Sequence, residues 1–123
     1  MNLNNILIGT EDPKRLKDYY TKIFGKPAME DEAFSGWQLG SGWISVGGHD
    51  QVKGKNAHPG RLIWNLESSD VKGDFAKLKA AGAIVVKEPY NPGGPPEFLI
   101  ATLADPDDNY FQLMSPMPPD MAP

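Results

Sequence analysis

The chain begins with a short β-forming run that is followed by a helical pattern of apolar positions. Residues 5–10 are rich in side chains that favour strands, and the run is short. Asp12 is placed as a helix N-cap, Pro13 as the first helical residue and Gly25 as the residue that ends the helix. Between them, apolar side chains recur at helical spacing, at Leu16, Tyr19, Tyr20 and Ile23. The pattern predicts a strand and then a helix.

The same pattern returns in the second half of the chain. Residues 61–67 form a second predicted strand, and Ser69 or Asp70 then caps a second helix. Gly82 ends that helix, 57 residues after the corresponding glycine of the first half. The apolar positions of the second helix are Val71, Phe75 and Leu78. We therefore predict an internal duplication.

Three short β-rich segments follow each predicted helix. In the first half they are residues 28–31, 34–39 and 43–47, and in the second half residues 83–87, 97–103 and 110–115. The Gly-Ser-Gly turn at 40–42 and the Asp-Pro-Asp-Asp-Asn turn at 105–109 predict hairpins. The whole pattern predicts an α+β fold of two βαβββ modules.

A Gly-rich segment without a regular pattern lies between the two halves, and a Pro-rich segment lies at the end of the chain. We expect one domain over residues 1–116 and a flexible tail over 117–123. Within the domain, module one spans 1–48, a linker spans 49–59 and module two spans 60–116.

Composition excludes several classes of function. The chain of 123 residues has a net charge of −4 and no basic run, which argues against nucleic acid and against anionic membranes as partners. Cysteine is absent, which excludes disulfides and thiolate metal sites. No apolar run of about 20 residues is present and the N-terminus lacks a basic leader, so we expect a cytoplasmic protein.

Three stretches, in order, resemble the vicinal oxygen chelate superfamily, also called the glyoxalase/bleomycin-resistance/dioxygenase superfamily. They are TEDPKRLKDYYTKIFGKP, SSDVKGDFAKLKAAGAIVVKEP and DPDDNYFQLMSP. The resemblance implies a glyoxalase-like half-open barrel, with each helix outside its sheet, and a homodimer. Asp108 stands where the family usually has glycine, and aspartate tolerates the positive φ that such a turn needs.

The resemblance also implies four positions for a divalent metal in the metal-dependent members, whose ligands are His, Glu or sometimes Gln. In this chain they correspond to Asn5, Ser45, Gln112 and either Ile63 or Arg61, depending on the alignment. These side chains include no imidazole and no carboxylate, which divalent metals prefer. We therefore predict no metal cofactor, with a divalent metal as the alternative.

Strand parity assigns the side chains that share a face with these positions. The predicted ligand-binding set comprises the apolar residues Leu7, Trp43, Ile63, Tyr110 and Met114 and the polar residues Asn5, Ser45, Arg61, Asn65 and Gln112. Such a lining is typical of a small-molecule pocket, but a small barrel can also fill its interior with side chains. Trp37 is expected at the pocket mouth or at a subunit contact, and His49 and His58 in a solvated loop.

These residues predict a metal-free binder of a small organic molecule, and an inward Arg61 would favour an anionic ligand. The alternative is a metal-dependent lyase, isomerase or dioxygenase, for which no catalytic residue is evident in the sequence. A third hypothesis is a non-catalytic interaction module without an open pocket.

Overall fold

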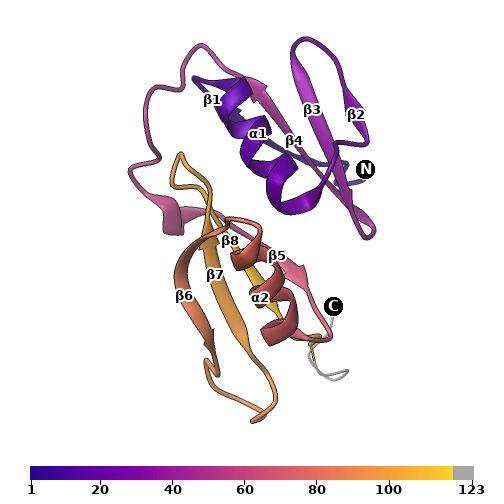
Figure 1. The fold of residues 1–123 in the computed structure, drawn as a ribbon, viewed down its shortest axis with the longest axis vertical. Helices are drawn as coiled ribbons and strands as arrows, with labels where there is room; N and C mark the ends of the chain where they lie inside the picture. The colour runs from indigo at the N-terminus through magenta and orange to yellow at the C-terminus, as the bar shows by residue number, and fades with distance from the viewer. Residues whose placement is uncertain (118–123) are drawn as a thin grey trace. The chain divides into compact units, whose positions relative to one another are not determined.

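The computed structural model describes residues 1–117, and the chain divides into two units. Unit one comprises residues 1–56 together with Asp105–Asp107. Unit two comprises residues 57–104 together with residues 108–117. Within residues 1–117, each unit contains one α-helix and one four-stranded sheet (Figure 1). Residues 118–123 of the predicted flexible tail lie outside the described residues.

Unit one has the predicted βαβββ order. Its elements are β1 (Ile6–Thr10), α1 (Pro13–Phe24), β2 (Met29–Glu30), β3 (Phe34–Leu39) and β4 (Gly42–Gly48). The strands lie in the order β1-β4-β3-β2, with β1 parallel to β4 and the other neighbours antiparallel. Helix α1 packs against one face of this sheet, which leaves the opposite face as the inner face of the module.

Helix α1 forms as its sequence predicts. The side chain of Asp12 accepts a hydrogen bond from the backbone N–H of Arg15 at 3.1 Å, and Pro13 occupies the first turn. The predicted apolar positions Leu16, Tyr19, Tyr20 and Ile23 are all buried. Gly25 follows the helix with a φ of 90°, which a residue with a Cβ rarely adopts.

Trp37 belongs to the core of unit one. It is buried beside Tyr20, and its indole N–H donates a hydrogen bond to the carbonyl oxygen of Gly25 at 2.8 Å. The expectation that Trp37 lies at a pocket mouth or a subunit contact is therefore wrong. Parity places it on the helix side of β3, where its large ring fills the space under α1.

Unit two repeats the architecture of unit one. Its elements are the 3₁₀ helix η1 (Pro59–Arg61), β5 (Ile63–Glu67), α2 (Val71–Ala80), β6 (Ile84–Tyr90), β7 (Ile100–Ala104) and β8 (Tyr110–Met114). The strand order is β5-β8-β7-β6, with β5 parallel to β8. This order matches that of unit one strand for strand, so the predicted duplication of a βαβββ module is confirmed.

Asp70, not Ser69, caps α2, since its side chain accepts a hydrogen bond from the backbone N–H of Gly73 at 3.0 Å. Under the helix, the rings of Trp64 and Phe111 stack with centroids 4.6 Å apart. Gly82 has a φ of 109°, in agreement with its predicted role after the helix.

The start of β5 differs from the prediction. The strand begins at Ile63 and not at Arg61, because Pro59 initiates a short 3₁₀ helix that includes Arg61. The strand parity that grouped Arg61 with Ile63 therefore does not apply. Leu62, which the same parity would place under the helix, is 62% exposed.

The turn between β7 and β8 contributes three residues to unit one. Asp105 is fully buried and accepts hydrogen bonds from the Tyr20 hydroxyl at 2.7 Å and from the backbone N–H of Asp107 at 2.8 Å. The carboxylate of Asp107 accepts hydrogen bonds from the Thr10 hydroxyl at 2.7 Å and from the Arg15 guanidinium at 2.8 Å. Two residues of α1 and the end of β1 are thus linked to this acidic turn.

Asp108 has a φ of 61°, so the expected tolerance of aspartate for this backbone conformation is confirmed. Within residues 1–117, no helix has the length and apolar character that a membrane crossing requires.

Candidate functional site

The inner face of unit one is defined by the residues of β4 that point away from α1. Ile44 and Val46 are buried on the helix side, so Trp43 and Ser45 lie on the inner face. Leu7 of β1 is in register with Ser45 and is half exposed. The predicted residues Leu7, Trp43 and Ser45 therefore share one face of one sheet.

Asn5 and Ser45, two of the positions that the resemblance assigns to a metal, contact each other. The Ser45 hydroxyl donates a hydrogen bond to the side-chain carbonyl oxygen of Asn5 at 3.0 Å. The Asn5 amide nitrogen in turn donates to the side chain of Asn4. The amide and the hydroxyl satisfy each other as neutral partners.

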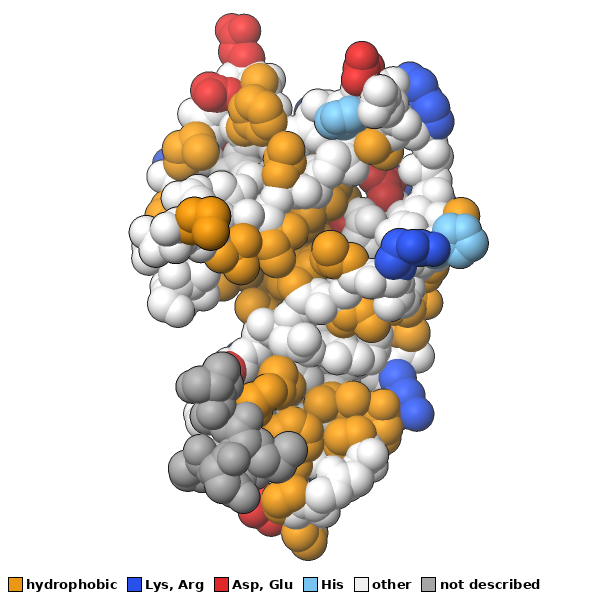
Figure 2. Space-filling view, turned by 180° about the vertical axis from the view of Figure 1, so that it is seen from behind, with side chains coloured by type: hydrophobic (Ala, Val, Ile, Leu, Met, Phe, Trp, Pro, Cys, Tyr) orange, Lys and Arg blue, Asp and Glu red, His pale blue; other side chains and the backbone are white. Residues whose placement is uncertain are grey.

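Two apolar residues on the inner face of unit one were not predicted. Met29 is 49% exposed and Phe34 is 41% exposed, and Figure 2 shows hydrophobic side chains at the surface of each unit. The ring of Phe34 lies over Gly47, where an added Cβ would come within 2.5 Å of it. The register of Phe34 with Gly47 follows from the hairpin between β3 and β4. Pairing the two predicted strands would therefore have placed Phe34 on the inner face.

The position of Phe34 is fixed by an aspartate turn. The side chain of Asp31 accepts hydrogen bonds from the backbone N–H groups of Ala33 at 2.7 Å and Phe34 at 2.9 Å. These hydrogen bonds, first from Phe34 and then from Ala33, lower the pKa of Asp31 because they stabilise its charged form.

The inner face of unit two contains five of its six predicted site residues. Phe111 and Leu113 are buried under α2, and Tyr110, Gln112 and Met114 alternate with them as half-buried residues. Ile63 is in register with Tyr110, and Asn65 is in register with Gln112. The sixth predicted residue, Arg61, is exposed in η1 and is not part of this face.

Gln112, the amide in the last strand, is held by a residue that was not predicted. Its Nε2 donates a hydrogen bond to the hydroxyl oxygen of Thr102 at 3.0 Å, and Thr102 is buried. The two residues are directly opposite in the antiparallel pair β7–β8. The alternation of side chains along β7 places Thr102 on the inner face. Predicting that it pairs with Gln112 also requires the register of the hairpin between β7 and β8.

The comparison with protein families gives a direct assignment. The sequence model of the family described as "Glyoxalase-like domain" matches residues 5–114. The chain belongs to this family. The glyoxalase-like domain thus covers both modules, and the expected membership of the vicinal oxygen chelate superfamily is confirmed.

Solved structures share the fold of this glyoxalase-like domain. A glyoxalase/bleomycin resistance protein/dioxygenase family enzyme from Burkholderia phytofirmans PsJN has a TM-score of 0.71 and 21% identity, with 95% of this chain and 100% of that chain covered. A glyoxalase-related enzyme from Fulvimarina pelagi has a TM-score of 0.68 and 18% identity over 99% and 96% of the two chains. The fosfomycin resistance protein FosX from Listeria monocytogenes has a TM-score of 0.68 and 17% identity over 95% and 94%. A comparison with curated proteins gives no match.

The glyoxalase-like domain does not carry a donor set that fits a divalent metal at the expected positions. In unit one the expected positions supply the amide of Asn5 and the hydroxyl of Ser45. In unit two they supply the amide of Gln112 with either the apolar Ile63 or the cationic Arg61, and Arg61 lies in η1, outside the strand. Neutral amides and a hydroxyl do not offset the charge of a dication that leaves water. Within residues 1–117, no three His, Asp or Glu side chains gather in a way that would hold a metal ion.

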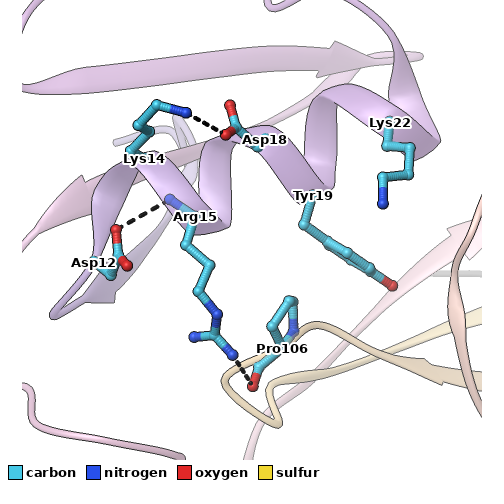
Figure 3. A pocket seen from close by; sticks show the side chains of 7 residues that line it. All are labelled: Asp12, Lys14, Arg15, Asp18, Tyr19, Lys22 and Pro106. Atoms are coloured by element: carbon cyan, nitrogen blue, oxygen red, sulfur yellow. Dashed lines mark hydrogen bonds and ion pairs between the residues drawn. The ribbon is translucent and has the colours of Figure 1, made fainter.

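One concavity of about 410 Å³ lies beside α1 in unit one (Figure 3). It is lined by Asp12, Lys14, Arg15, Asp18, Tyr19, Lys22 and Pro106. Lys14 pairs with Asp18 at 2.6 Å, which raises the pKa of Lys14, and Arg15 donates to the Pro106 carbonyl oxygen. Much of its charge is thus already paired, and none of the predicted ligand-binding residues lines it.

Proposed function

We propose that this glyoxalase-like domain is a metal-free binder of a small, partly apolar organic molecule. The proposal is carried by the hydrogen bonds at the family's metal positions. Asn5 is hydrogen-bonded to Ser45, and Gln112 to Thr102, so amide and hydroxyl groups engage each other at the positions where the resemblance implies metal ligands. Such groups suit hydrogen bonding to an organic ligand better than the coordination of a dication.

The apolar side chains around these polar pairs support an organic ligand. In unit one, Leu7, Met29 and Phe34 expose large apolar surfaces, and in unit two Tyr110 and Met114 are half buried. Apolar and aromatic surfaces with a few polar groups are typical of small-molecule sites. One structural neighbour is a fosfomycin resistance protein, which is consistent with a fold that acts on small organic compounds.

The rival function is a metal-dependent lyase, isomerase or dioxygenase. Elemental analysis of the purified protein separates the two, with wild type, Gln112→Ala and the exposed-loop variant Gln51→Ala compared. We expect substoichiometric metal in all three. A near-stoichiometric transition metal in wild type and Gln51→Ala that is lost in Gln112→Ala would overturn the proposal.

Ligand binding is tested by thermal shift against a panel of aromatic and polar small molecules, followed by calorimetry of the hits. We expect saturable stabilisation, because a ligand that binds only the folded state raises its stability. Hits should weaken on Ser45→Leu or Gln112→Leu. A panel without any hit would favour the interaction module that lacks an open pocket.

A homodimer and a cytoplasmic location are part of the same proposal, and both rest on the family resemblance and the sequence pattern. Light scattering coupled to size-exclusion chromatography tests the first. A mass equal to twice that of the 13.5 kDa chain is expected, and a monomer at all concentrations would refute it.

A further inference from the structure

A row of three polar residues crosses the inner face of unit two. Asn65 in β5 is in register with Gln112 in β8, and Gln112 is in register with Thr102 in β7. Because neighbouring strands lie about 4.8 Å apart, the row spans roughly 10 Å. Three adjacent strands therefore present hydrogen-bonding side chains along one line.

The centre of the row is oriented by its own hydrogen bond. Gln112 donates one N–H to the buried Thr102 hydroxyl at 3.0 Å. A primary amide has two N–H donors and a carbonyl oxygen that accepts, so one donor and the acceptor remain for a bound molecule. In the part of the chain that the structure describes, Asn65 has no hydrogen-bond partner for its side chain, and it adds a second amide at the exposed end of the row.

The rows on either side of this polar row are mainly apolar. One consists of Ile63, Tyr110 and Ala104, and the other of Glu67, Met114 and Ile100. In these three strands, the inner face has one charged side chain, the exposed carboxylate of Glu67. One cation borders the polar row from the fourth strand, since Lys87 in β6 is in register with Thr102. Its ammonium lies 3.8 Å from the centre of the Tyr90 ring, and β7 separates its strand from that of Gln112. Arg61 lies outside the strand in η1.

We propose that this row recognises an uncharged planar group that carries both a donor and an acceptor, such as a carboxamide, lactam or imide, in preference to a carboxylate or phosphate. The inference rests on the proposed binding function and specifies its ligand class. An amide edge satisfies the remaining donor and acceptor of Gln112 together. A carboxylate offers no donor to the Gln112 carbonyl oxygen, and Lys87, the cation that borders the row, lies two strands away from Gln112.

The test uses matched pairs of probes that differ in this one group, namely benzamide against benzoate and nicotinamide against nicotinate. Affinities are measured by calorimetry or NMR titration in buffer with a chelator. We expect each amide to bind about tenfold more tightly than its acid, the ratio that one hydrogen bond of about 1.4 kcal/mol produces.

Gln112→Met keeps the length of the side chain but removes its hydrogen bonds, and it should abolish the preference for the amide. Thr102→Val removes the hydroxyl that orients the amide, and it should reduce the preference several-fold. Gln51→Met, a glutamine in an exposed loop of unit one, is the matched control and should behave as wild type. If Gln112→Met does not fold, the affinity ratio of amide to acid in Thr102→Val decides whether the inference stands.

The outcomes separate this inference from the function on which it rests. Acids that bind as tightly as their amides, or a preference that survives both substitutions, would overturn the inference and leave the binder proposal intact. A complete absence of binding by all four probes and by the wider panel would overturn both.

Discussion

Replacement of Tyr20 by phenylalanine tests the buried acidic turn of unit one. The Tyr20 side chain is fully buried, and its hydroxyl donates a hydrogen bond to the carboxylate of Asp105 at 2.7 Å. The Tyr20 ring stacks on Phe24 with centroids 5.8 Å apart and contacts Trp37 at 5.9 Å. Tyr20→Phe keeps these ring contacts and removes the hydroxyl group alone.

The expected cost follows from the charge and burial of the acceptor. A hydrogen bond to a charged group contributes about 1.5 to 3 kcal/mol, and a buried acceptor that loses a donor adds a desolvation penalty. We expect the free energy of unfolding to fall by about 2 to 3 kcal/mol. For a chain of this length that corresponds to a decrease in melting temperature of roughly 10 °C.

The assay is urea unfolding followed by circular dichroism, with melting temperatures from calorimetry. The matched control is Tyr90→Phe, because the Tyr90 hydroxyl has no hydrogen bond within residues 1–117 and its ring keeps the Lys87 ammonium at 3.8 Å. That control should change stability by less than about 0.5 kcal/mol. Equal effects of the two substitutions would refute the role assigned to the buried carboxylate.

Three further predictions concern stability. Burial, and then the neighbouring Asp105 carboxylate, raise the pKa of the Tyr20 hydroxyl. Above pH ~10 the unfolded chain loses this proton while the folded chain keeps it, so the free energy of unfolding should fall by up to about 1.4 kcal/mol per pH unit. Urea unfolding between about pH 9 and pH 11 should show this decrease for the wild type, and Tyr20→Phe should lack it. Gly47→Ala places a methyl group 2.5 Å from the Phe34 ring and should lower the free energy of unfolding by about 1 kcal/mol. The control Gly36→Ala places its methyl group 3.5 Å from the nearest atom and should be neutral or stabilising in the same assay. Asp70→Ala should cost about 1 kcal/mol through loss of the helix cap, and Ser69→Ala, which makes no cap, should not.

The elements of the fold were predictable because their signals are local. The cap residues Asp12 and Asp70 bind backbone N–H groups three residues later, and Gly25 and Gly82 adopt the positive φ values that their positions suggested. The repetition of this pattern at a fixed interval then predicted the duplicated module. Alternation along β4 and β8 also placed the inner-face residues correctly, since side chains alternate between the faces of a strand.

The contacts that were not predicted connect residues distant in the sequence. Thr10 and Asp107 are 97 positions apart, and Tyr20 and Asp105 are 85 apart. No local pattern indicates which acid a buried hydroxyl will meet. The partner of Gln112 escaped prediction for a related reason, because its identity depends on the register of a hairpin and not on the alternation within one strand.

Arg61 shows how one local element changes a functional expectation. The short 3₁₀ helix that begins at Pro59 ends at Arg61, which therefore lies before the strand. Arg61 is therefore not an inward-facing residue of β5, and the expected preference for an anionic ligand has no structural basis. The inner face of unit two still presents the polar row centred on Gln112, so the proposed ligand class rests on the hydrogen-bonding groups of that row.

The central claim is that organic ligands bind this glyoxalase-like domain without a metal. The most direct measurement is the affinity of the tightest hit of the panel, determined by calorimetry before and after exhaustive treatment with a chelator. We predict that the dissociation constant stays the same within error. Loss of binding after chelation, and its recovery on addition of one equivalent of a divalent ion, would contradict the claim.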